Sequence, residues 1–211
     1  MCDWDKIKKH LTSNDKLMSG LIEMYGKPTI MQHSVPEINL FDSLVNSIIS
    51  QQLSVVAAKN IKARLYKFSE VEEFNPEMFV KLSDQDLRRC GLSKAKCDYT
   101  KGLAHELKKS PEFLKAMINQ RDEKVIINLT KVKGIGIWTA QMFLLFALKR
   151  MDVFSAKDAG LMRGIRVTYF EGTLPSIDDL EKITNRWKPY RSIGAWYMWQ
   201  VANAQPSIIV K

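Results

Sequence analysis

Cysteine is scarce in this 211-residue chain, and no apolar run is long enough to span a membrane, so we expect no membrane partner. The three cysteines (Cys2, Cys90 and Cys97) are odd in number and dispersed, which favours reduced thiols in an intracellular compartment. The first residues lack the pattern of a secretory signal, so the protein is not expected to be secreted. Strand-like alternation and regular repeats are also lacking. The sequence therefore predicts an all-α fold.

Acidic residues are outnumbered by basic ones. The chain has 23 Asp and Glu against 32 Lys and Arg, a net charge of +9 and an isoelectric point near 9.4. Such a balance favours a polyanionic partner such as nucleic acid, although charge alone would also fit an anionic membrane surface. Lys94 and Lys96 are expected on a solvated helix face, as secondary candidates for long-range attraction of that partner.

Apolar residues recur at helical spacing along most of the chain. A polar break, Ser50-Gln51-Gln52-Leu53-Ser54, interrupts one such stretch and is either an interhelical turn or a functional loop. The pattern predicts helices over residues 3–25, on both sides of the break at 50–54, over 76–81, 97–108, from 111, over 138–148, from 159, and over 176–187 and 191–203.

The most informative stretch contains a tight turn, Val132-Lys133-Gly134-Ile135-Gly136, followed by a strongly apolar segment. Gly134 and Gly136 carry no Cβ, so the backbone can turn sharply and expose its N–H groups. These amides, with the first turn of the next helix, would form an anion site. This pattern predicts a helix–hairpin–helix that grips a nucleic-acid phosphate. The alternative is a helical hairpin with a glycine turn and no ligand.

Three segments together resemble one protein family: GIGIWTA at 134–140, DVFSAKD at 152–158 and RWKPYRS at 186–192. They are similar to the helix–hairpin–helix (HhH-GPD) DNA glycosylases, in particular the 3-methyladenine DNA glycosylase II branch and its short yeast-type alkyladenine members. The resemblance extends from about Phe41 to Ala202. It implies two helical lobes with a DNA-binding cleft between them, lobe one from about 1–35 plus 145–211 and lobe two from about 36–144. Three cysteines cannot hold the iron–sulfur cluster of the related endonuclease III branch.

By this resemblance the catalytic aspartate falls on Asp158, whose position directly before a helix also predicts a helix N-cap. The two roles are compatible, because a carboxylate at a helix start can stabilise a nearby cation. Cleavage of an N-glycosidic bond develops oxocarbenium charge, which an adjacent anion would stabilise. The carboxylate could also orient or deprotonate the attacking water. Trp138 stands where strand-cleaving members carry a Schiff-base lysine, so we expect a monofunctional enzyme.

Several further residues receive roles from the resemblance. Trp138 and Trp199, with Phe154, would form the pocket for an extruded base, although such aromatics are often core. Met142 departs from an aromatic found in the bacterial relative. Gln52 would fill the space left by the extruded base, with Leu53 and Ser54 in the minor groove. Phosphate contacts would come from the amides of Gly134, Gly136 and Trp138 and from the Thr139 hydroxyl, and a structural Na⁺ or K⁺ would bind the carbonyls of Thr130, Val132 and Ile135.

These expectations define a monomeric DNA repair glycosylase that requires no cofactor. It would excise alkylated purines, chiefly 3-methyladenine and 7-methylguanine, and leave abasic sites. The compartment would be the nucleus in a eukaryote and the cytoplasm otherwise. Two alternatives stay open: a protein of the same fold that binds abasic or damaged DNA without excision, and a helix–hairpin–helix binding module of a larger complex. Asp158 favours the enzyme, whereas Met142 and Ser54 favour the non-catalytic alternative.

Overall fold

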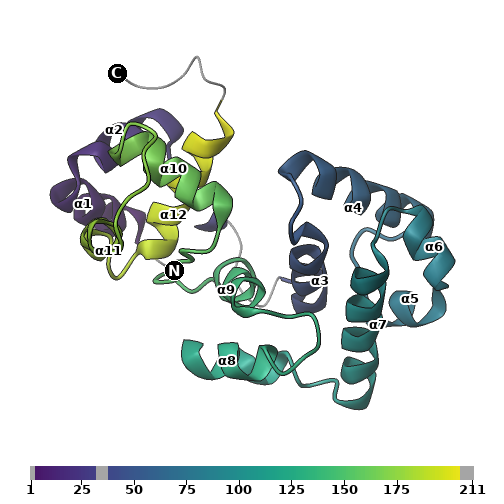
Figure 1. Cartoon of the computed structure of the whole chain (residues 1–211). Helices are drawn as coiled ribbons and strands as arrows, with labels where there is room; N and C mark the ends of the chain where they lie inside the picture. The colour runs from purple at the N-terminus through teal and green to yellow at the C-terminus, as the bar shows by residue number, and fades with distance from the viewer. Residues whose placement is uncertain (1–2, 32–37, 205–211) are drawn as a thin grey trace. The chain divides into compact units, whose positions relative to one another are not determined.

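The computed structural model describes residues 3–31 and 38–204, which form helices joined by turns and loops, without a strand in these ranges (Figure 1). The predicted all-α fold is confirmed. No helix in the described part of the chain is both long and apolar enough to cross a bilayer. The helices are α1 (Trp4–Asn14), α2 (Lys16–Tyr25), η1 (Thr29–Met31), α3 (Leu40–Ser50), α4 (Val55–Ser69), α5 (Pro76–Lys81), α6 (Asp84–Arg89), α7 (Lys94–Lys109), η3 (Lys115–Met117), α8 (Asp122–Leu129), α9 (Ile137–Phe146), α10 (Ala159–Tyr169), α11 (Ile177–Arg186) and α12 (Arg191–Asn203).

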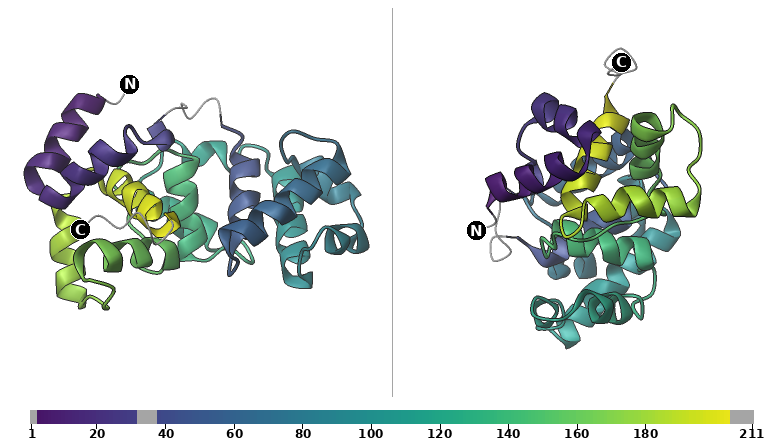
Figure 2. Two further views of the ribbon diagram at one scale, coloured as in Figure 1. Left: turned by 90° about the horizontal axis from the view of Figure 1, so that it is seen from above. Right: turned by 90° about the vertical axis from the view of Figure 1, so that its left-hand side faces the viewer.

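The chain divides into two compact units. Unit 1 comprises residues 1–34 and 149–211, and unit 2 comprises residues 35–148. In unit 1 the N-terminal helix α2 packs against the C-terminal helix α12, so the two ends of the chain share one core (Figure 2). The sequence predicts that lobe one resumes at about residue 145, and unit 1 resumes at Lys149, so that all of α9, which packs against α3 and α8, belongs to unit 2. The predicted cleft between the lobes stays a prediction.

In unit 1, Asp15 interrupts the helical run that the sequence predicts over residues 3–25. Its side chain accepts hydrogen bonds from the amides of Leu17 (3.1 Å) and Met18 (3.3 Å), which begins α2 as a separate helix. Its second oxygen accepts from the Tyr169 hydroxyl (2.7 Å) and the Trp187 indole N–H (3.0 Å). This buried carboxylate thus ties α2 to the C-terminal part of the unit.

Helices α10 and α12 of unit 1 approach each other closely at Gly164. A Cβ added to Gly164 would overlap the backbone carbonyl of Met198, so a larger residue would force the two helices apart. One turn earlier on α10, a Cβ at Gly160 would lie 3.2 Å from the Trp199 ring. This close packing brings the start of α10 against the end of α12.

In unit 2, α9 is apolar on nearly every side and lies in the core, where it packs against α3 and α8. An aromatic cluster adds to this core: Phe74 stacks on Tyr66 (ring centroids 4.1 Å apart) and meets Phe79 edge-on (5.5 Å). The helix predicted to begin at Pro111 is absent. A hydrogen-bonded turn and the short η3 take its place, with bonds between residues three apart such as Phe113 N–H to the Ser110 carbonyl (3.0 Å).

Candidate nucleic-acid interface and active site

The glycine hairpin of unit 2 joins α8 to α9, and its two glycines differ in what they do. Gly134 has φ +88°, and the Tyr99 ring occupies the place where its Cβ would be, so both backbone and packing require glycine. Gly136 caps α9 with an ordinary φ of −93°, and nothing lies within 4 Å of a Cβ built there. The fold therefore does not need glycine at 136. The bare backbone leaves room for an outside group to approach the start of α9.

Two residues of the first turn of α9 were predicted to assist at this place. Trp138 is half-buried. Thr139 is only 1 % exposed, and its hydroxyl accepts a hydrogen bond from the Gln51 side-chain amide at 2.9 Å. This burial is at odds with the predicted phosphate contact of the Thr139 hydroxyl, which faces the protein interior. Backbone amides remain as the donors at this turn.

The proposed cation would be held by backbone carbonyls at the end of α8 and in the turn. Ile135 N–H donates to the Val132 carbonyl at 3.1 Å, which closes the turn and uses one of the two lone pairs of that oxygen. Thr130 caps the C-terminus of α8, where helix carbonyls carry partial negative charge. Among the described residues no cluster of His, Cys, Asp or Glu could hold a metal. Oxygen ligands alone suit Na⁺ or K⁺, and this cation stays a prediction.

The loop between α3 and α4 presents the predicted plug. Gln52 is exposed and has φ +57°, a left-handed conformation that is uncommon for a residue with a side chain. Leu53 is 38 % exposed. Ser54 caps α4 by accepting from the Ala57 amide (3.2 Å), a structural task that the sequence-based assignment to the minor groove did not include. The next two residues, Val55 and Val56, extend an exposed apolar surface from Leu53. The sequence could have indicated this exposure, because Val55 and Val56 directly follow a serine that can cap a helix.

Lys96 differs from its predicted role. Lys94 lies exposed at the start of α7, as expected, but the Lys96 ammonium donates to the carbonyls of Ile49 and Gln51, both at 2.7 Å. Burial lowers the pKa of Lys96 below that of an ordinary lysine. This side chain therefore supports the end of α3 and does not line a solvated face.

Asp158 of unit 1 caps α10, which confirms the predicted structural role. Its Oδ1 accepts from the Leu161 amide at 2.7 Å and from the Trp199 indole N–H at 2.8 Å, and the residue is 9 % exposed. Trp199 thus contributes a hydrogen-bond donor to the carboxylate in addition to its ring. Phe154 meets Trp187 edge-on with ring centroids 6.4 Å apart and joins the core of unit 1, as in the core alternative for the aromatics.

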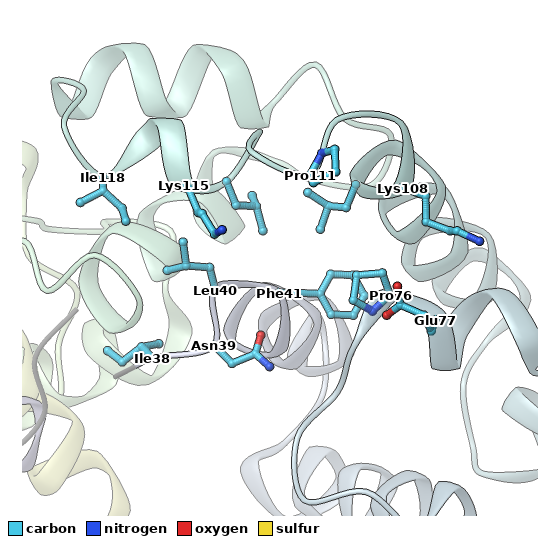
Figure 3. A pocket seen from close by; sticks show the side chains of 12 residues that line it. Ile38, Asn39, Leu40, Phe41, Pro76, Glu77, Lys108, Pro111, Lys115 and Ile118 are labelled. Atoms are coloured by element: carbon cyan, nitrogen blue, oxygen red, sulfur yellow. The ribbon is translucent and has the colours of Figure 1, made fainter. Parts of the chain in front are cut away.

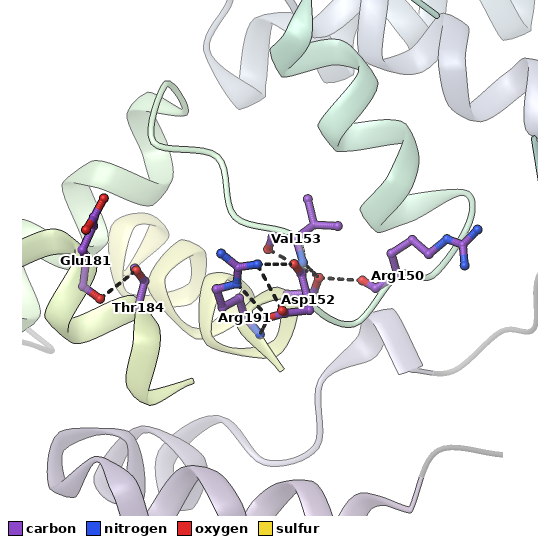
Figure 4. A network of polar contacts seen from close by, with 7 residues as sticks. Arg150, Asp152, Val153, Glu181, Thr184 and Arg191 are labelled. Carbon is purple, nitrogen blue, oxygen red and sulfur yellow. Dashed lines mark hydrogen bonds and ion pairs between the residues drawn. The ribbon is translucent and has the colours of Figure 1, made fainter. Parts of the chain in front are cut away.

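A polar network precedes Asp158 in the chain and was not predicted (Figure 4). The Arg191 guanidinium donates to both carboxylate oxygens of Asp152, at 2.7 and 3.0 Å, and to its backbone carbonyl at 3.0 Å. The buried Ser192 hydroxyl donates to the Arg150 carbonyl (2.6 Å) and accepts from the Val153 amide (3.0 Å). These bonds fasten the start of α12 to the loop that leads to Asp158. The same helix carries Trp199 nearer its end. The RWKPYRS segment, which contains Arg191 and Ser192, was the sequence feature that could have indicated this network.

The predicted pocket residues are shared between the units. Trp138 and Met142 lie one turn apart on α9 of unit 2, and Met142 is 4 % exposed. Phe154 and Trp199 belong to unit 1. Their assembly into one base pocket stays a prediction.

A groove of about 600 Å³ in unit 2 is lined by none of these residues (Figure 3). It lies between the start of α3, the start of α5 and the segment from the end of α7 to η3. Leu40, Phe41 and Leu107 give it apolar walls, and Lys108 and Lys115 add charge. Its composition does not point to the predicted chemistry.

Two features together define a helix–hairpin–helix protein that acts on nucleic acid. One is the glycine turn that exposes the first amides of an apolar helix. The other is the aspartate that caps a second helix and accepts from an indole N–H. The chain belongs to the HhH-GPD superfamily of base excision DNA repair proteins, whose sequence pattern matches residues 45–189. The predicted family is confirmed.

Particular relatives cover nearly the whole chain. It is 31% identical over 205 residues to the alkylbase DNA glycosidase-like protein mag2 of Schizosaccharomyces pombe, covering 94% of each chain. It is 29% identical to the DNA-3-methyladenine glycosylase of Saccharomyces cerevisiae, covering 96% of this chain and 81% of the relative. The structure is similar to that of the S. pombe 3-methyladenine DNA glycosylase Mag1 in complex with abasic DNA, with a TM-score of 0.82, 28% identity and coverage of 92% and 95% of the two chains.

Proposed function

We propose that this protein is a DNA N-glycosylase that extrudes an alkylated purine from duplex DNA, hydrolyses its N-glycosidic bond and leaves an abasic site. The observation that carries the proposal is the Asp158 carboxylate, fixed at the start of α10 by the Leu161 amide and the Trp199 indole. Relatives named as 3-methyladenine glycosylases support 3-methyladenine as a substrate. We propose 7-methylguanine as a second substrate from the family resemblance.

The chemistry asked of the protein is modest, because an alkylated purine already carries positive charge and leaves readily. What remains is to stabilise the oxocarbenium charge that develops on the sugar and to orient a water molecule. Asp158 can do both, and the Leu161 amide and the Trp199 indole N–H hold it in place before the substrate arrives. Trp138 offers no amine where strand-cleaving relatives have a lysine, so the enzyme would be monofunctional.

The DNA would be held by uncharged donors and by a plug. The amides of Gly134, Gly136 and Trp138 would contact a phosphate, with Na⁺ or K⁺ on the neighbouring carbonyls. Gln52 would enter the duplex, and Leu53 would lie in the minor groove. We propose that the protein acts as a monomer in the compartment that holds the genome, the nucleus in a eukaryote and the cytoplasm otherwise.

A second candidate function is recognition of abasic sites without excision. Two points favour it. By the resemblance, Met142 stands where the bacterial relative has an aromatic, and the short Ser54 side chain is committed to capping α4. In this case Gln52 and the hairpin would still bind DNA, and Asp158 would act only as a helix cap.

The deciding experiment measures free base released from methylated duplex DNA, beside equilibrium binding to a duplex that contains a tetrahydrofuran abasic analogue. Release of 3-methyladenine or 7-methylguanine that disappears in Asp158→Asn, with abasic-site binding retained, supports the glycosylase. Tight binding with no release, by the native protein and the variant alike, supports the second candidate.

A further inference from the structure

The end of α3, just before the predicted plug, is held from outside its own helix. Lys96 on α7 donates from its ammonium to the carbonyls of Ile49 and Gln51, each at 2.7 Å. The last carbonyls of a helix have no partner within it and carry partial negative charge, which a cation satisfies. Lys96 therefore fixes the point at which the chain leaves α3.

The Gln51 side chain links this point to the phosphate hairpin. Its amide donates to the Gly134 carbonyl and to the Thr139 hydroxyl, both at 2.9 Å. Gly134 lies in the turn, and Thr139 lies in the first turn of α9. A single residue beside the plug thus contacts both parts of the hairpin.

Gln52 itself lies in a conformation that needs such support. Its φ of +57° is a left-handed value that is strained for a residue with a Cβ, so the surroundings must determine it. The peptide that joins Gln51 to Gln52 is fixed through the Gln51 carbonyl by Lys96, and Leu53 N–H donates to the Ser50 carbonyl at 3.3 Å on the other side.

We propose that Lys96 and Gln51 are positioning residues that hold Gln52 in its plug conformation before DNA binds and couple it to the phosphate hairpin. The proposal rests on the proposed function, in which Gln52 enters the duplex. Lys96 then acts through carbonyls of its own chain and touches no nucleotide. Preorganisation of the plug lowers the entropy lost on binding and so raises the affinity for DNA that lacks a base.

The test is a double-mutant cycle of Lys96→Met and Gln52→Ala, read by affinity for a duplex with a tetrahydrofuran abasic analogue. Lys96→Met keeps the apolar stem and removes the ammonium, and we expect it to weaken binding about tenfold. In a Gln52→Ala background the same change should have little further effect, because the plug is already gone. Lys96→Arg should restore most of the affinity, and Lys109→Met, which removes an exposed charge at the other end of the same helix, should leave it unaltered.

The outcomes separate this proposal from the proposed function. If Gln52→Ala does not weaken binding, the plug assignment fails. If Gln52→Ala weakens binding but Lys96→Met does not, or weakens it equally in both backgrounds, only the positioning role fails. Should Lys96→Met unfold at the assay temperature, Gln51→Met takes its place in the cycle and decides by the same criteria.

Discussion

The indole N–H of Trp199 donates to Oδ1 of Asp158 at 2.8 Å, although 41 residues separate the two in the chain. Close contact of α10 and α12 at Gly164 makes this bond possible. The same oxygen caps α10 through the Leu161 amide, so one atom serves both the helix and the indole. The orientation of the carboxylate is therefore a property of the helix pair, and Trp199 can influence excision without contacting the base.

Removal of that N–H alone should slow the chemistry. Trp199→Phe keeps an aromatic ring and deletes the donor to Asp158, and a hydrogen bond to a charged group contributes about 1.5–3 kcal/mol. We expect the single-turnover excision rate on methylated DNA to fall at least about tenfold, with affinity for an abasic duplex within about twofold.

The matched control for Trp199→Phe is Trp196→Phe on the same helix. It deletes an indole donor to the Thr29 hydroxyl (3.1 Å) that has no link to Asp158. Its excision rate should equal that of the native protein. Equal losses in both variants would show that general packing of α12, and not the bond to Asp158, sets the rate.

The clamp between Arg191 and Asp152 gives a second prediction. Lysine cannot reproduce the bidentate hydrogen bond of the guanidinium to the Asp152 carboxylate. Arg191→Lys should therefore loosen the loop that leads to Asp158. We expect the single-turnover rate to fall about fivefold, while DNA affinity holds. Lys182→Gln removes an exposed ion pair with Asp179 in the same unit and should change neither quantity. A loss of affinity without a loss of rate for Arg191→Lys would contradict the positioning role.

The sequence was sufficient to predict those features that depend on a local pattern of neighbouring residues. Asp158 as a cap, the turn at Gly134 and the last helix from Arg191 all follow from neighbouring residues, and the structure has them. It failed where a partner lies far along the chain. Lys96 looks like any exposed lysine on a basic helix, because its partners, the carbonyls of Ile49 and Gln51, lie more than forty residues away and are part of every peptide bond.

Side chains with two possible uses were the other difficulty. Thr139 lies in the first turn of α9, which favours a phosphate contact, and only the fold reveals that its hydroxyl accepts from Gln51. Trp199 was assigned by its ring, whereas the bond to Asp158 uses its N–H. Spacing along a helix indicates which residues share a face, but not which of two functional groups on one side chain is used.

The two described cysteines should be unreactive in the folded protein. Cys90 and Cys97 are buried, and burial raises the pKa of both thiols, so little of the nucleophilic thiolate exists near neutral pH. Cys2 lies outside the described residues, so the experiment uses Cys2→Ser. A thiol-specific chromophoric reagent at pH 8 should react at least about a hundredfold more slowly with the native protein than with the protein in urea.

The same shifts predict a pH dependence of stability. Because the folded-state pKa values are raised, the unfolded chain releases the thiol protons first as pH increases. The free energy of unfolding should therefore decrease above about pH 8.5, and Cys97→Ala should remove part of that slope. Urea titrations at several pH values measure this. Rapid labelling of the native protein, or a slope unaffected by Cys97→Ala, would contradict the assignment.

The two glycines of the hairpin should separate folding from DNA binding. Gly134→Ala meets both a left-handed φ and the Tyr99 ring, so it should destabilise the fold by about 1–3 kcal/mol. Gly136→Ala places its methyl group in open space, so the free energy of unfolding should change little while affinity for DNA falls.

An amide carries no net charge, so the loss at Gly136 should leave the salt dependence of binding unaltered. Lys133→Gln, at an exposed position in the same turn, should instead flatten the log–log salt slope by about 0.9 if that lysine neutralises a phosphate. Binding titrations of the three variants between low and moderate salt distinguish these effects. Full affinity in Gly136→Ala would mean that no phosphate approaches the start of α9, and the helix–hairpin–helix would then be a structural turn alone.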